Sequence, residues 1–153
     1  MSQNLNFIIP ELFLVIFNLS FLSIMMFVKS AAILSNGNKI AALALMITAV
    51  LVYSAPVESD PIINGFYTSN EFTSFFKMLI LFLSSVILYL SDAYLKKNDL
   101  LKYEFPLLIN FSVFGMMVVI SSNDLMALYL GIEIQSLSLY IIAAYRRDNL
   151  KST

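Results

Sequence analysis

Residues 72–95 read FTSFFKMLILFLSSVILYLSDAYL, a run in which Lys77 and Asp92 are the only charged residues. A helix needs about 20 predominantly apolar residues to cross the roughly 30 Å hydrocarbon core of a bilayer. Four further runs are similarly apolar, and none alternates apolar and polar residues as membrane β-barrel strands do. The sequence therefore predicts an all-α integral membrane protein with a single transmembrane domain over residues 1–153, whose helices lie at about 7–28, 32–55, 72–95, 105–121 and 124–145.

The composition also indicates a lipid environment. Of the 153 residues, 59% are hydrophobic and 12% are charged, whereas soluble globular domains have about 25% charged residues. The chain contains no Cys and no His, so disulfides, haem attachment, iron–sulfur clusters and the commonest zinc sites are excluded. It has no Gly-rich phosphate loop and no basic tract. We therefore expect membrane lipids as contacts, no nucleic-acid partner, and no cofactor bound by this chain.

Turn-forming residues separate the apolar runs and are expected to form the connecting loops. These segments are 35–38 (Ser-Asn-Gly-Asn), 56–70, 96–99 (Lys-Lys-Asn-Asp) and 121–124 (Ser-Ser-Asn-Asp). The last segment is so short that the two helices it joins should be antiparallel neighbours. Ser122 or Asn123 is the expected N-cap of the final helix, and the helix dipole favours the negative charge of Asp124 at that end.

The basic residues fall on one side of the predicted domain. With five helices, all nine Lys and Arg residues except Lys77 flank the first loop, lie in the third loop or follow the last helix. The second loop carries Glu58, Asp60 and Glu71 but no basic residue. By the positive-inside rule, the C-terminus is expected to face the cytoplasm or matrix and the N-terminus the outer side.

Glu133 lies near the middle of the predicted helix 124–145, where a charged carboxylate costs roughly 2.5–3.5 kcal/mol on insertion scales. Surroundings of low dielectric favour the neutral form of a carboxyl group, so Glu133 is a candidate proton-transfer group that changes state near neutral pH. At helical spacing, Tyr129, Ser136 and Tyr140 share its face and are candidate supporting hydroxyl groups. The alternative is a buried carboxylic acid that makes a structural hydrogen bond to a neighbouring helix.

Two other charged residues lie in or next to apolar runs. Lys77 lies about one turn inside helix 72–95, where it either extends its ammonium group to the outer interface or, if buried, forms an ion pair with Glu133. Glu11 follows Pro10, a combination typical of the first turn of a helix. We therefore interpret Glu11 as part of an ordinary helix start.

The segment 103–153 carries a resemblance to a known family. Its most distinctive part is LGIEIQSL at 130–137, followed by Leu139 and Tyr140 and preceded by an Asn-Asp-Leu loop and a helix that contains Gly115. This pattern resembles subunit 2 of proton-pumping NADH:quinone oxidoreductase, respiratory complex I, and more distantly the related antiporter-like subunits. The resemblance implies the N-terminal part of the antiporter-like subunit fold, whose later helices are absent from this sequence.

The resemblance also implies a function. In this family, the glutamate that matches Glu133 belongs to a proton half-channel and pairs with a lysine on a later helix. The chain would then be a subunit of an H⁺-translocating NADH:ubiquinone reductase without redox catalysis of its own. NADH, FMN, iron–sulfur clusters and ubiquinone would be bound by other subunits. The expected partners are other membrane-arm subunits and, under a split-gene hypothesis, a second polypeptide that supplies the missing C-terminal helices.

Two alternatives remain open at the level of the sequence. The chain could be a structural or assembly subunit of the same complex without proton conduction, or a subunit of a cation/proton antiporter. The expected location is the mitochondrial inner membrane, with the bacterial plasma membrane as the alternative.

Overall fold

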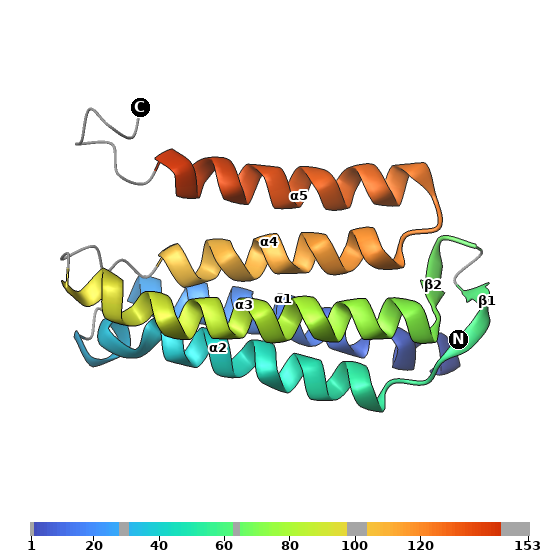
Figure 1. The fold of residues 1–153 in the computed structure, drawn as a ribbon, viewed down its shortest axis with the longest axis horizontal. Helices are drawn as coiled ribbons and strands as arrows, with labels where there is room; N and C mark the ends of the chain where they lie inside the picture. Colours follow the sequence, from blue (N-terminus) through green and yellow to red (C-terminus); the bar gives the residue numbers. More distant parts are fainter. Residues whose placement is uncertain (1, 28–30, 63–64, 98–103, 145–153) are drawn as a thin grey trace.

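The computed structural model describes residues 2–27, 31–62, 65–97 and 104–144. Over these residues it contains five α-helices and one small antiparallel sheet of two strands (Figure 1). In chain order the elements are α1 (Ser2–Phe27), α2 (Ala31–Ser54), β1 (Glu58–Ile62), β2 (Tyr67–Ser69), α3 (Glu71–Lys97), α4 (Glu104–Ser121) and α5 (Leu125–Ala143).

All five helices run along the long axis of the molecule and are long and apolar enough to cross a membrane (Figure 1). Their outer surfaces carry large apolar side chains such as Ile16, Phe72 and Leu90, each more than half exposed, as lipid-facing surfaces require. The expected fold class, an all-α integral membrane protein with five spanning helices, is confirmed. The expected helix ends at residues 28 and 145 lie outside the described residues.

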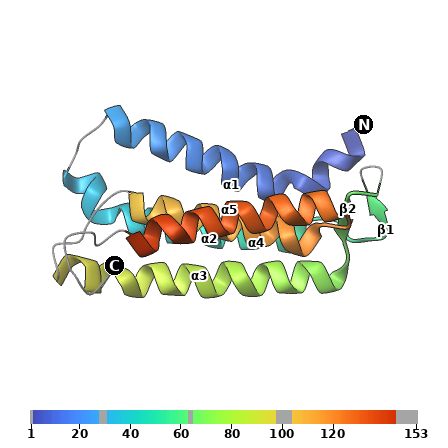
Figure 2. The ribbon, with the colours of Figure 1, turned by 90° about the horizontal axis from the view of Figure 1, so that it is seen from above.

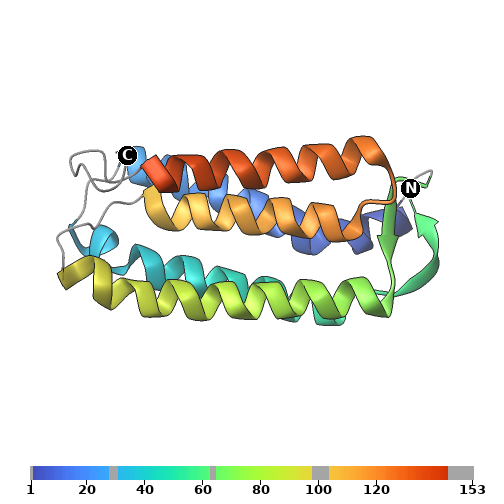
Figure 3. The same cartoon turned by 45° about the horizontal axis from the view of Figure 1, so that its top comes forward.

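The apolar core lies between the first four helices. Leu14 of α1, Leu45 of α2, Leu81 and Leu88 of α3 and Met117 of α4 are completely buried and belong to one contiguous cluster. In contrast, α5 packs mainly against α4 and lies at the edge of the bundle (Figures 1 and 3). Most of the surface of α5 is therefore free to contact further helices or lipid.

Two glycines bring α4 and α5 close together. A Cβ atom at Gly115 would lie 2.7 Å from the carbonyl oxygen of Gly131 and 2.8 Å from the backbone nitrogen of Gln135. A Cβ atom at Gly131 would lie 2.8 Å from Cγ2 of Val119. Small residues at such contacts let two membrane helices approach through their backbones. This contact fixes the position of the α5 segment that carries Glu133.

The expected loop at residues 35–38 is wrong, because α2 continues through this segment, in agreement with the expected helix at 32–55 that includes it. Gly37 and Asn38 are buried: the position of a Cβ atom at Gly37 is 3.6 Å from side-chain atoms of both Phe21 and Met25. The Nδ2 atom of Asn38 lies 3.5 Å from Oδ1 of Asp92 on α3. Packing against α1 and α3 therefore overrides the turn preference of Ser, Asn and Gly, as tertiary context often does.

The expected loop at residues 56–70 contains the β-hairpin, which the sequence analysis did not predict. Glu58 pairs with Ser69 and Ile62 with Tyr67, and Gly65 has a φ of 90°, which favours glycine. The hairpin lies at the end of the bundle where the α4–α5 turn also lies (Figure 1). We call this the hairpin end.

The short α4–α5 turn joins antiparallel neighbours, as predicted (Figure 3). Its capping residue is Asp124, which accepts a hydrogen bond of 2.9 Å from the backbone N–H of Met126. The expected caps, Ser122 and Asn123, have other partners. Ser122 donates to the carbonyl of Val119, whereas Asn123 donates to the carbonyls of Phe66 and Gly65 and so attaches this turn to the hairpin.

Candidate functional site

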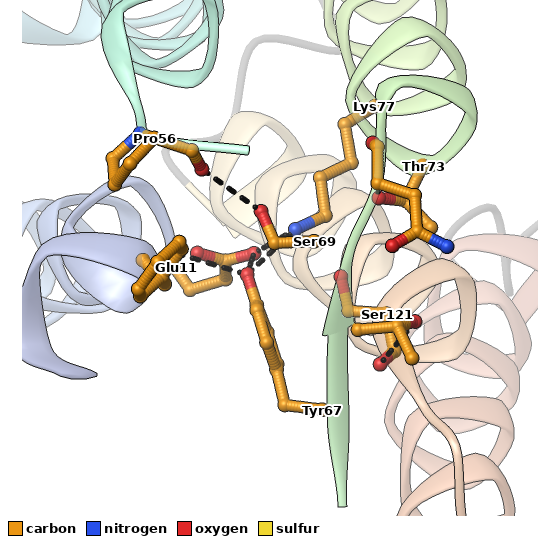
Figure 4. Close-up of polar contacts among 10 residues, drawn as sticks. Glu11, Pro56, Tyr67, Ser69, Thr73, Lys77 and Ser121 are labelled. Atoms are coloured by element: carbon orange, nitrogen blue, oxygen red, sulfur yellow. Dashed lines mark hydrogen bonds and ion pairs between the residues drawn. The ribbon is translucent and has the colours of Figure 1, made fainter. Parts of the chain in front are cut away.

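A buried ion pair lies near the hairpin end, between α1 and α3. The Nζ atom of Lys77 is 2.6 Å from Oε1 of Glu11, and the two side chains are only 4% and 6% exposed. Figure 4 shows both side chains converging on the hydroxyl group of Tyr67 from β2. Helix α1 thus meets the distant β2–α3 segment in one polar cluster, Glu11–Tyr67–Lys77.

The Tyr67 hydroxyl links the two charges. It accepts a hydrogen bond from Lys77 at 2.8 Å and lies within donating distance of Oε1 of Glu11, at 2.9 Å, and of the carbonyl oxygen of Phe7, at 3.0 Å. Burial raises the pKa of this hydroxyl, and the negative charge of Glu11 raises it further. Tyr67 therefore keeps its single proton and can donate to only one of the two acceptors at a time.

The backbone explains how Glu11 reaches this position. Helix α1 begins at Ser2, so Pro10 lies inside the helix and Glu11 is not in its first turn. The interpretation of Glu11 as part of a helix start is therefore wrong. A proline within a helix removes one backbone hydrogen bond and bends the helix, and α1 bends in its N-terminal part (Figure 2). The Phe7 carbonyl on this part of α1 is the one that lies near Tyr67.

The side chain of Lys77 is buried inside the bundle, so it does not extend to the outer interface. Its ion-pair partner is Glu11, so the suggested Lys77–Glu133 pair is wrong. The β-hairpin positions Tyr67 next to Lys77, with Ser69 donating to the carbonyl of Pro56 and Thr73 to that of Asn70. The sequence did hold a signal for this pair. Glu11 and Lys77 are opposite charges that lie at similar depth, near the outer ends of their predicted spans.

Glu133 lies in α5 and is partly buried within the chain. No hydrogen bond or ion pair of its carboxylate is found among the described residues. Ser136 donates to the backbone carbonyl of Glu133 at 3.1 Å and not to its side chain, while Tyr129 and Tyr140 are 64% and 69% exposed. The expected hydroxyl neighbours thus share the helix but do not form a network around the carboxylate in this part of the fold.

Two further polar pairs with buried members were not predicted from the sequence. The Nδ2 atom of Asn110 on α4 donates to Oδ1 of Asn18 on α1 at 3.2 Å, and both residues are completely buried. At the other end of the bundle, the buried Asp92 pairs with Lys96 one turn later in α3 at 2.7 Å. Polar bonds of this kind commonly join helices inside membranes.

This arrangement defines a class of protein: a polytopic membrane protein that carries paired and unpaired ionisable groups inside its helix bundle.

A scan against family models found no match. NADH-quinone oxidoreductase subunit N of Pelagibacter ubique is 38% identical over 152 residues, which are 99% of this chain and 32% of that protein. Subunit N of Rhodospirillum rubrum is 40% identical over 146 residues, 95% of this chain and 30% of that protein.

A third relative, subunit N of a Jannaschia species, is 48% identical over 90 residues, which are 59% of this chain and 19% of that protein. The chain thus spans about a third of the length of the curated relatives that match nearly all of it. It belongs to the family of NADH-quinone oxidoreductase subunit N, the antiporter-like subunit. The resemblance predicted from residues 103–153 is confirmed, and it extends over almost the whole chain.

Proposed function

We propose that this chain is part of the membrane arm of a proton-pumping NADH:quinone oxidoreductase and that Glu133 transfers protons in it. The relatives named as subunit N support the assignment to this complex. The placement of Glu133 supports its role, because an ionisable residue inside a spanning helix is costly to retain without a use. In this proposal the chain performs no redox chemistry, and other subunits bind NADH, FMN, the iron–sulfur clusters and ubiquinone.

The position of α5 carries this proposal. Glu133 has no ionic partner among the described residues, and α5 packs mainly against α4, so its remaining surface is open to further helices. A lysine on one of these helices would pair with Glu133 and complete the half-channel.

The proposed mechanism is electrostatic. A carboxylate next to a cationic lysine binds a proton weakly, whereas a carboxyl group in apolar surroundings without that cation binds it strongly. Quinone reduction elsewhere in the complex would shift charges along the membrane arm and change the distance between Glu133 and its lysine. Glu133 would then take up a proton in one arrangement and release it in the other.

The test is Glu133→Gln in the assembled complex, with proton pumping measured per electron transferred. We expect pumping to fall while the complex still assembles, because Gln keeps the shape of Glu but cannot exchange a proton. Glu104→Gln is the matched control, since Glu104 is exposed at the start of α4. Unchanged pumping and electron transfer in Glu133→Gln would refute the proposal and favour a structural or assembly role.

A further inference from the structure

A cavity beside the Glu11–Lys77 pair contains unpaired polar atoms. Its volume is about 180 Å³, and Glu11, Tyr67, Ser121 and Ser122 line it together with apolar side chains from α1, α4, α5 and the hairpin region. Oε2 of Glu11 and Oγ of Ser121 are fully buried, and neither makes a hydrogen bond of good geometry among the described residues, although the Ser121 hydroxyl lies near that of Tyr67. Two buried polar atoms from two different helices are therefore unpaired at the same cavity.

We infer that this cavity is a hydration site through which Glu11 exchanges a proton with the aqueous phase at the hairpin end of the bundle. A buried carboxylate oxygen without a partner is strongly unfavourable. A water molecule needs only roughly 10–15 Å³ of such volume and two to four polar partners, and the cavity offers both. Its lining includes Phe66 and Ser122, which lie in the hairpin and the α4–α5 turn next to the surface.

The contacts of Tyr67 allow the proton to be exchanged without breaking the cluster. A hydrated proton that reaches Oε2 forms an O–H bond there, leaves neutral water behind, and converts the Glu11 carboxylate into a carboxyl group. Lys77 keeps its proton and its hydrogen bond to the Tyr67 oxygen. The Tyr67 proton can then turn from Oε1 of Glu11, at 2.9 Å, to the Phe7 carbonyl, at 3.0 Å. The reverse steps return the proton to water.

Few other ionisable groups lie near Glu11. Among the residues that line the cavity, Glu11 and Tyr67 are the only ionisable ones, and Lys77 contacts Glu11 from α3. Tyr67 stays protonated because burial raises its pKa. A proton that enters the cavity would therefore reach the carboxylate of Glu11, whose Oε2 atom is the unpaired one. The Glu11–Lys77 pair joins α1 to α3, whereas Glu133 belongs to α5 and does not line the cavity, so the inference does not depend on the role of Glu133.

The first test measures whether water reaches the cavity. The chain has no Cys, so Ser121→Cys in the native assembly would carry the only thiol of this chain. We expect aminoethyl methanethiosulfonate to label it at least about tenfold faster than Ser112→Cys, because only a hydrated thiol ionises readily. Ser112 is the matched control: it is a buried serine of α4 whose Oγ is also unpaired, but it does not line the cavity. Equal or slower labelling of Ser121→Cys would overturn the inference.

The second test measures proton exchange at Glu11. The labelling rate of Ser121→Cys should show two inflections with pH, one from the thiol and one from the neighbouring Glu11–Lys77 pair. The second inflection should disappear when Glu11→Gln is added, and it should persist when Glu133→Gln is added instead. If Glu11→Gln alone prevents assembly, Glu11→Gln combined with Lys77→Met, which removes both charges, replaces it. Identical profiles with and without the Glu11 carboxylate would show that Glu11 does not exchange protons there.

Discussion

Nζ of Lys77 and Oε1 of Glu11 are 2.6 Å apart in the interior of the bundle, although the two residues are separated by 66 positions in the sequence. The contact joins α1 to α3 at the hairpin end, and Tyr67 of β2 bonds to both side chains. Each charge makes the burial of the other possible, because an unpaired charge in such surroundings is far more costly than a pair.

The first prediction concerns this pair. Lys77→Met leaves the Glu11 carboxylate without its cation and is expected to destabilise the protein by about 3–5 kcal/mol, the usual cost of breaking a buried pair on one side. The double variant Glu11→Gln/Lys77→Met removes both charges and should recover much of this loss. Thermal denaturation of the three proteins in mild detergent measures the effect. A double variant no more stable than Lys77→Met alone would show that the two charges are not coupled.

The second prediction concerns the contact between α4 and α5. Gly115→Ala places a Cβ atom against the backbone of Gly131 and Gln135, which cannot move aside as a flexible side chain would. We expect a loss of about 1–3 kcal/mol, seen as faster proteolysis of α5. Gly37→Ala is the control, because its Cβ atom would meet only side-chain atoms, at 3.6 Å or more, and alanine favours a helix. Equal effects of the two substitutions would contradict the proposed role of the close contact.

The third prediction concerns the start of α5. Asp124→Ala removes the acceptor for the Met126 N–H and is expected to cost about 1 kcal/mol, whereas Asp124→Asn should cost little because asparagine is as good a cap. Amide hydrogen exchange over the first turn of α5 measures this difference. Faster exchange in Asp124→Asn than in Asp124→Ala would rule out the cap as the reason.

The fourth prediction concerns orientation. From the distribution of basic residues, the hairpin end should face the outer side and the opposite end the matrix or cytoplasm. A cysteine at Asn123, in the α4–α5 turn, should react with an impermeant thiol reagent added outside sealed vesicles. A cysteine at Lys39, exposed near the other end, should react only after the vesicles are opened. The reverse pattern would invert the topology.

The five helices were predictable because each needs only length and apolar composition, which are local properties. The 35–38 segment was not, since its helical form depends on Phe21, Met25 and Asp92, which contact it from other helices. The same holds for the capping residue: Asn123 was a reasonable candidate by type, but its side chain is used by the hairpin.

The candidate site was predictable only in part. Glu133 was singled out because its charge is rare in an apolar run and because it matches a distinctive motif. The Glu11–Lys77 pair was missed because the Pro10–Glu11 sequence has a strong local interpretation as a helix start. That interpretation gives no sign that α1 begins at Ser2 and turns Glu11 toward α3. Such a contact between distant segments depends on the packing of the whole bundle.

The most direct test of the central claim is to isolate this chain gently from its native membranes and to identify its companions by mass spectrometry. We expect subunits of NADH:quinone oxidoreductase among these companions. Recovery of the chain by itself, or with subunits of a cation/proton antiporter, would contradict its place in the membrane arm of the oxidoreductase.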